Sequence, residues 1–163
     1  YIKSGNKEVI DKRFLMQMHS QLVDELVDDR ERGIIRKRAV RIAGSDYVPP
    51  ASAIEIEEQL DHIIEEQALL SNPLEKAVYL HCNIAKLQPF IDGNKRTSRL
   101  TESVVLMNED IIPIFSTSNL DINDYRTGIL YFYETGEYTQ YADYFLKNKL
   151  KYLQKYTDKV LLN

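Results

Sequence analysis

The most informative stretch of this sequence is Gln88-Pro89-Phe90-Ile91-Asp92-Gly93-Asn94-Lys95-Arg96-Thr97-Ser98-Arg99. Proline disfavours helical geometry in the residue before it, so a helix that reaches this stretch is expected to end near Gln88. The Asp-Gly-Asn run favours a tight turn. Gly93 also lets a ligand approach the backbone closely, because it has no Cβ. A new helix is expected to begin after Gly93-Asn94, with three cations in its first turns.

This expected helix start has the composition of an anion-binding site. A helix N-terminus exposes unpaired N–H groups and the positive end of the helix dipole. Arg96 and Arg99 are three residues apart, so they can share one side of the helix and clamp phosphate oxygens. Asp92 offers a hard oxygen ligand suited to Mg²⁺ that bridges phosphates. These groups predict a cradle for a polyphosphate and a metal ion. The alternative is an ordinary turn followed by a cationic surface helix.

Most of the remaining chain has helical periodicity. Ser52 with Glu55 has the capping-box pattern, and Pro73 favours a helix start. Asp121 and Thr139 are expected to cap two further helices. The apolar faces of the expected helices are Phe14, Leu15, Met18, Leu22 and Leu26; Ile56, Leu60, Ile63 and Ile64; Ala77, Leu80, Ile84 and Leu87; Leu100, Val104 and Val105; and Tyr141, Phe145, Leu146 and Leu150. This pattern predicts an all-α helical bundle.

Residues 36–50 interrupt the helical pattern. Val40 and Ile42 alternate with small or charged residues, and Gly44-Ser45 can turn the chain. Tyr47-Val48 reads as extended before two prolines. The prediction is a short β-hairpin that protrudes from the bundle as a flap and leans on it, since a lone two-stranded ribbon is marginally stable.

The stretch 88–99 resembles the signature of the Fic (filamentation induced by cAMP) family, which in words runs His-Pro-Phe-x-Asp/Glu-Gly-Asn-Gly/Lys-Arg-x-x-Arg. Every defining position agrees except the first. Leu80-His81 lies upstream at the usual offset, and Val40–Pro50 resembles the flap hairpin of the family. The resemblance covers about residues 10–150, and it implies a single Fic domain over residues 1–163. Because the chain opens on Tyr1, we expect it to be a fragment of a slightly longer protein.

Fic proteins are helical domains that mostly transfer AMP from ATP to a hydroxyl group of a target protein. The resemblance implies that Asp92 binds Mg²⁺ and that Gly93 with Asn94 forms the anion-binding turn. Lys95 and Arg96 would hold the α- and β-phosphates of ATP, and Arg99 the γ-phosphate. Phe90 is expected to anchor the loop in the core. Related Doc-type kinases carry lysine at the position of Lys95, so the motif alone leaves open whether AMP or phosphate is transferred.

The position of the family's catalytic histidine is occupied by Gln88. In the family this residue takes the proton from the incoming hydroxyl, and a primary amide is essentially non-basic. We therefore expect an impaired protein adenylyltransferase, and the alternatives are a Doc-like kinase and a non-catalytic, nucleotide-gated binding module. His81 lies two helical turns before Gln88, about 10.5 Å away along the helix, so it is expected to be a core residue. His19 and His62 are expected to be structural or exposed.

The flap is expected to dock the target protein, because in Fic proteins the corresponding hairpin holds an extended target segment by main-chain pairing. Val40, Arg41, Ile42 and Tyr47 are the predicted docking residues. The basic stretch that includes Arg41 runs from residue 30 to 41, and we expect it to be mainly a solvated face. Many Fic proteins carry an inhibitory helix with a Ser/Thr-x-x-x-Glu-Gly/Asn motif. No convincing copy occurs here, so an inhibitory helix is expected upstream or in a partner protein.

Bulk properties restrict the class of protein. The chain has 163 residues, a net charge of −4 and a pI near 5.4, so it lacks the charge for bulk attraction to DNA or anionic lipid. Cys82 is the single cysteine, which excludes an internal disulfide and fits a reducing compartment. The longest apolar runs are too short to span a membrane. We therefore expect a cytoplasmic protein that binds neither nucleic acid nor membrane, in an oligomeric state that the sequence does not predict.

Overall fold

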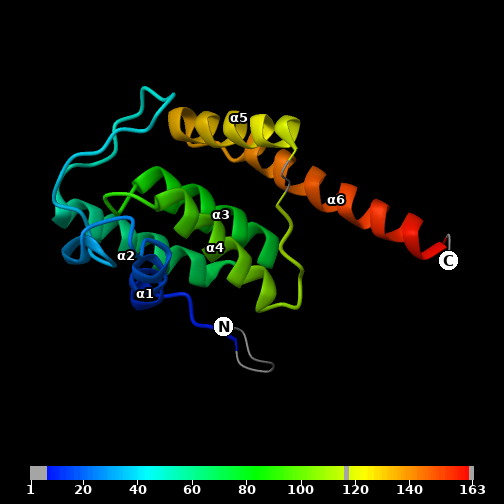
Figure 1. Ribbon diagram of the computed structural model, residues 1–163, viewed down its shortest axis with the longest axis horizontal. Helices are drawn as coiled ribbons and strands as arrows, with labels where there is room; N and C mark the ends of the chain where they lie inside the picture. Colours follow the sequence, from blue (N-terminus) through cyan, green and yellow to red (C-terminus); the bar gives the residue numbers. More distant parts are fainter. Residues whose placement is uncertain (1–6, 116–117, 162–163) are drawn as a thin grey trace. The chain divides into compact units, whose positions relative to one another are not determined.

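The computed structural model describes residues 7–115 and 118–161 of the chain. These residues form six α-helices and one short 3-10 helix, shown in Figure 1. In chain order they are α1 (Lys12–Leu22), η1 (Asp29–Glu31), α2 (Ala53–Leu69), α3 (Pro73–Leu87), α4 (Asn94–Met107), α5 (Asn119–Thr135) and α6 (Thr139–Leu161). The chain divides into two compact units, Tyr1–Ile112 and Pro113–Asn163. No helix in the described part of the chain is long and apolar enough to cross a membrane.

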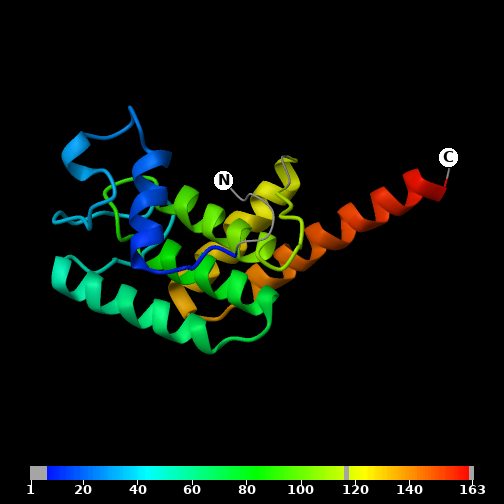
Figure 2. The same ribbon diagram turned by 90° about the horizontal axis from the view of Figure 1, so that it is seen from below.

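The first unit is built on the pairing of α3 with α4, which run along each other in both views (Figures 1 and 2). Helix α2 packs on α3, and α1 packs on α4. Leu15, Ile56, Leu80 and Leu106 bring one side chain from each helix into the fully buried core. Burying such a side chain contributes about 1.5–3 kcal/mol. The predicted all-α fold is therefore correct, and its core faces are mainly those expected from the periodicity.

The helix starts of this unit follow the predicted signals. The Ser52 side chain accepts a hydrogen bond from the backbone N–H of Glu55 at the start of α2. Pro73 occupies the first turn of α3, after Asn72 as the N-cap. Two details of the periodicity were wrong: Leu26 is 58% exposed because α1 ends at Leu22, and Leu100 is 36% exposed.

His81 joins the core of the α3–α4 pair, as expected. Its Nδ1 lies 2.8 Å from Oε2 of Glu102, and both side chains are buried. Cys82 is fully buried, and that burial raises the pKa of its thiol. The contact between His81 and Glu102 joins α3 to α4 within the core.

The predicted β-hairpin is wrong. In the described residues, the segment between η1 and α2 contains no strand and crosses the views of Figures 1 and 2 as an irregular loop. We call residues 38–50 the flap. Its base is closed by the guanidinium of Arg36, which binds the carbonyl oxygens of Arg38 and Pro50. These carbonyls are thus occupied by a side chain, and the prolines at 49 and 50 have no N–H with which to continue a ladder.

The basic stretch before the flap is largely neutralised by local ion pairs. Arg32 lies 2.6 Å from Asp24 and 3.0 Å from Asp29. Arg38 pairs with Glu31. Such exposed pairs contribute at most about 1 kcal/mol each. The expectation of a solvated face therefore fits these arginines, whereas Arg36 is buried.

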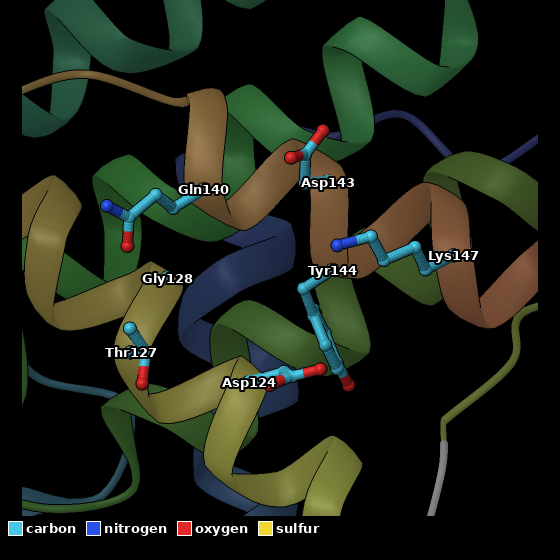
Figure 3. A pocket seen from close by; sticks show the side chains of 7 residues that line it. All are labelled: Asp124, Thr127, Gly128, Gln140, Asp143, Tyr144 and Lys147. Carbon is cyan, nitrogen blue, oxygen red and sulfur yellow. The ribbon is translucent and has the colours of Figure 1, made fainter.

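The second unit consists of α5 and α6. Ser118 caps α5 by accepting a hydrogen bond from the N–H of Asp121, so Asp121 is the third residue of the helix and not its cap. Tyr141 and Phe145 of α6 are buried, whereas Leu146 and Leu150 are 44% and 65% exposed. A cavity of about 180 Å³ lies between the two helices (Figure 3), and none of the predicted site residues lines it.

Candidate functional site

The motif loop, residues 88–94, and the flap line one cavity in the first unit. The cavity has a volume of about 260 Å³ and is lined by residues 40–43, Gln88 and residues 91–96. Three of the four predicted docking residues and most of the predicted nucleotide-binding residues therefore meet at one place. Their convergence does not depend on strand pairing in the flap.

The floor of the cavity is the N-terminus of α4. Gly93 is the N-cap, with φ 76°, and no side chain caps the helix. A Cβ at Gly93 would lie 2.6 Å from Cγ1 of the buried Val23, so only glycine fits here without a shift. The uncapped N–H groups and the helix dipole favour a bound anion.

The charged side chains around the cavity reinforce this preference. Arg41 from the flap and Lys95 and Arg96 from α4 give three cations, against the single carboxylate of Asp92. Lys95 and Arg96 are exposed. In a protein with a net charge of −4, this is a local concentration of positive charge that suits a polyphosphate.

Asp92 could contribute one ligand to a metal ion. Its side chain is 63% exposed, with one oxygen 3.2 Å from Nη2 of Arg96 and the other accepting a 2.6 Å hydrogen bond from the N–H of Gly93. Within the described residues no group of three or more acidic, His or Cys side chains could hold a metal. A single carboxylate fits Mg²⁺ only when substrate phosphates complete its coordination.

Gln88 stands at the end of α3 in the left-handed conformation, with φ 51° and ψ 57°. Both polar atoms of its side-chain amide form hydrogen bonds. Nε2 donates to the carbonyl of Ala85 at 2.6 Å, and Oε1 accepts from Nδ2 of Asn94 at 3.1 Å. The residue is 9% exposed. Gln88 therefore lines the cavity while its polar atoms brace the loop.

Asn94 is the centre of this bracing. Its Oδ1 accepts from the N–H of Phe90, and its Nδ2 donates to the carbonyl of Phe90 as well as to Gln88, with both Phe90 bonds at 2.8 Å. The side chain is 4% exposed. It shapes the turn from within, so the predicted anion contact of Asn94 would have to come from its backbone N–H.

His19 holds the loop from α1. Its ring stacks on Phe90, with centroids 3.8 Å apart and planes within 7°. Its Nδ1 accepts from the N–H of Gly33 at 2.9 Å, so the proton is on Nε2, which donates to the carbonyl of Asp92 at 3.0 Å. Burial is the main cause that lowers the pKa of His19. Because Nδ1 accepts a hydrogen bond, the ring is neutral in this structure, and Phe90 lies fully buried against it.

Sequence reasoning missed His19 and Arg36 as partners of the motif loop. Both lie more than 50 positions before the loop. His19 resembles any histidine of a helix, and Arg36 resembles the other members of a basic run. Nothing in the sequence therefore indicated that these two residues contact the motif loop. Of the remaining predicted residues, Arg99 and Tyr47 do not line the cavity. Tyr47 lies beneath Lys86, whose Nζ is 4.8 Å from the ring centre.

The sequence model of the Fic/DOC family matches residues 9–106, a range that includes the motif loop and the flap. Protein adenylyltransferase fic-1 of Caenorhabditis elegans is 25% identical over 143 residues, which are 87% of this chain and 28% of the relative. Protein adenylyltransferase Fic of Nematostella vectensis is 32% identical over 83 residues, covering 48% of this chain and 19% of the relative. The chain thus spans about a quarter of these relatives.

Solved structures share the fold. Fic-1 from C. elegans aligns with a TM-score of 0.75 at 23% identity, over 94% of this chain and 44% of that one. A Fic family protein from Desulfovibrio desulfuricans aligns with a TM-score of 0.78 at 19% identity, over 91% and 47%. BepC of Bartonella tribocorum, solved with bound AMPPNP, aligns with a TM-score of 0.66 at 15% identity, over 90% and 77%.

Proposed function

Because the chain belongs to the Fic/DOC family, we propose that its cavity binds ATP with Mg²⁺ and that it is a protein adenylyltransferase impaired by Gln88. The observation that carries the proposal is the convergence of an uncapped helix N-terminus, three cations and the flap on one cavity. The matched relatives named as adenylyltransferases and the AMPPNP bound to BepC support the same class of ligand.

The residues have distinct roles in this proposal. The N–H groups at the start of α4, with Lys95 and Arg96, bind phosphate oxygens. Asp92 would hold Mg²⁺, which when bound would supply positive charge to stabilise the phosphates. Arg99 is assigned to the γ-phosphate, which would extend from the cavity along α4.

AMP transfer requires a proton acceptor. The oxygen of a target hydroxyl bonds to the α-phosphorus, the bond from that phosphorus to the bridging oxygen breaks, and pyrophosphate leaves. The hydroxyl proton must go to a base, and the amide of Gln88 is both non-basic and already bonded to Ala85 and Asn94. Losing a general base slows such a step by about 10²–10⁴-fold.

The hydrogen bonds of the Gln88 amide also support the second candidate, a nucleotide-gated binding module without catalysis. Gln88 contributes bracing bonds to the loop, so the cavity can be retained for binding while the chemistry is lost. In this case the flap residues Val40, Arg41, Ile42 and Tyr47 hold a protein partner in response to nucleotide. A Doc-like kinase remains the enzymatic alternative because of Lys95.

Labelled nucleotide separates these candidates. The protein and its Gln88→His variant are incubated with a cell lysate and ATP labelled at the α- or the γ-phosphate, with Arg96→Ala as the control for use of the cavity. We expect α-label on protein, at least about 10²-fold faster with Gln88→His. Equal α-labelling by both proteins would contradict impairment. Transfer of γ-label indicates a kinase, and no transfer by either protein while ATP still binds indicates the module.

A further inference from the structure

Among the residues that the structure describes, the buried side chain of Arg36 forms no ion pair with a carboxylate. It is 3% exposed, and each of its side-chain hydrogen bonds goes to a backbone carbonyl. Burial lowers the pKa of this guanidinium, yet arginine keeps its charge in proteins. A buried charge is costly unless its donors are satisfied. Such a residue is therefore held in one geometry by the carbonyls around it.

Those carbonyls come from three places in the chain. Nε donates to Gln88 at 2.6 Å, Nη1 to Arg38 at 2.8 Å and Nη2 to Pro50 at 2.6 Å. The backbone N–H of Arg36 also donates to the carbonyl of Pro89 at 3.0 Å. One residue thus joins the two ends of the flap to the first two residues of the motif loop.

The flap makes local hydrogen bonds near its tip. Ser45 N–H donates to the carbonyl of Ile42 at 3.3 Å, and Tyr47 N–H donates to the side chain of Ser45 at 3.1 Å. No strand ladder fixes the flap within the described residues. The position of residues 40–43 over the cavity therefore depends on how the base of the flap is held.

We propose that Arg36 is a positioning residue that sets the gap between the flap and the motif loop by tying both ends of the flap to the carbonyl of Gln88. The planar fork of arginine can address several carbonyls at fixed angles, which the single ammonium of lysine cannot reproduce. Only the nucleotide that fills the gap is taken from the proposed function. The coupling between flap and loop follows from the hydrogen bonds of Arg36.

The first test measures flap order without any ligand. Backbone ¹⁵N order parameters of residues 40–44 are compared in the wild type, Arg36→Met, Arg36→Lys and the exposed neighbour Lys37→Met. We expect the order parameters of these residues to fall below about 0.6 in Arg36→Met. They should be partly restored in Arg36→Lys and should equal the wild-type values in Lys37→Met. The α3 amides report on folding. A flap that stays as ordered in Arg36→Met and Arg36→Lys as in the wild type overturns the proposal.

The second test measures whether the gap matters for a ligand. Calorimetry with Mg·ATP should show affinity weakened on the order of ten-fold in Arg36→Met, because a preorganised wall is lost, and unchanged in Lys37→Met. Unchanged affinity in Arg36→Met would overturn the role of Arg36 at the cavity. A wild type that binds no Mg·ATP would instead refute the proposed function, and the order parameters would still decide the positioning role.

Discussion

The motif loop and the flap line the same cavity but are held in different ways. The motif loop is braced from inside, because Asn94 bonds both polar groups of the Phe90 backbone and also Gln88. The flap is held from outside, by the guanidinium of Arg36 at its base. Irregular backbone can therefore be fixed by its own side chains or by a residue that precedes it in the chain.

The difference matters for what each region can do. The braced loop holds the N-terminus of α4 in one geometry, which suits an anion that must bind in one fixed position. The flap can adjust if its base is altered, which suits a surface that accepts a partner. Changes in the loop should therefore affect stability strongly, and changes in the flap should affect it weakly.

The largest expected effect is that of Gly93→Ala. The new Cβ meets Val23 in a buried site and the positive φ disfavours alanine, so we expect the protein to lose about 2–4 kcal/mol of its free energy of unfolding. Gly136→Ala is the matched control, since its φ is 77° and no atom lies within 4 Å of the added carbon. Gly44→Ala, in the exposed flap at φ 82°, completes the series.

Urea unfolding of the three variants separates conformation from packing. Gly136→Ala and Gly44→Ala should each lose about 1 kcal/mol, the cost of alanine at positive φ. If Gly93→Ala loses no more than these two variants, the motif loop is not more tightly packed than the flap, and the comparison fails.

The same contrast explains what could be predicted from the sequence. Pro89, Gly93 and Asn94 act locally, so the end of α3 at Leu87 and the start of α4 at Asn94 lie within one residue of the predicted positions. The polar groups expected at the site also converge on one cavity, except for Arg99 and Tyr47. The hydrogen bonds that the side-chain amides of Asn94 and Gln88 form within the loop could not be predicted, because residue type does not determine which way an amide points.

The flap could not be predicted because a strand requires a pairing partner as well as an alternating pattern. Val40 and Ile42 have the alternation, but carbonyls at the two ends of the segment are taken by Arg36. The prediction that Leu26 belongs to the first helix was also wrong, because α1 ends at Leu22, before Val23, and Glu25 adopts φ 63°. In the flap, the contacts of Arg36 override the local pattern.

The smallest expected effect is a dependence of loop stability on pH. Burial lowers the pKa of His19 in the folded protein, against the carbonyl and charge of Asp92, which raise it, and the charge of Arg96, which lowers it further. The neutral ring bonds Gly33 and Asp92. Its contribution is thus fully present above the unfolded pKa of about 6.5 and is lost as pH falls through the lower folded pKa.

His19→Gln provides the test, because glutamine also offers a donor group and an acceptor group but does not titrate. The free energy of unfolding is measured in urea at pH 7.5 and 5.5 for both proteins. We expect the wild type to lose more stability than His19→Gln at the lower pH. Equal losses would show that His19 does not carry a pH-sensitive brace of the motif loop.

The most direct test of the central claim is calorimetry of Mg·ATP binding to the wild type, Arg96→Ala and Arg126→Ala. Arg126 is an exposed arginine of α5 and controls for the loss of one positive charge. The account predicts binding by the wild type, unchanged affinity in Arg126→Ala, and affinity weakened roughly 10–100-fold in Arg96→Ala, as expected for a lost charged hydrogen bond. No binding by the wild type, or equal affinity in both variants, would contradict a nucleotide cradle at the start of α4.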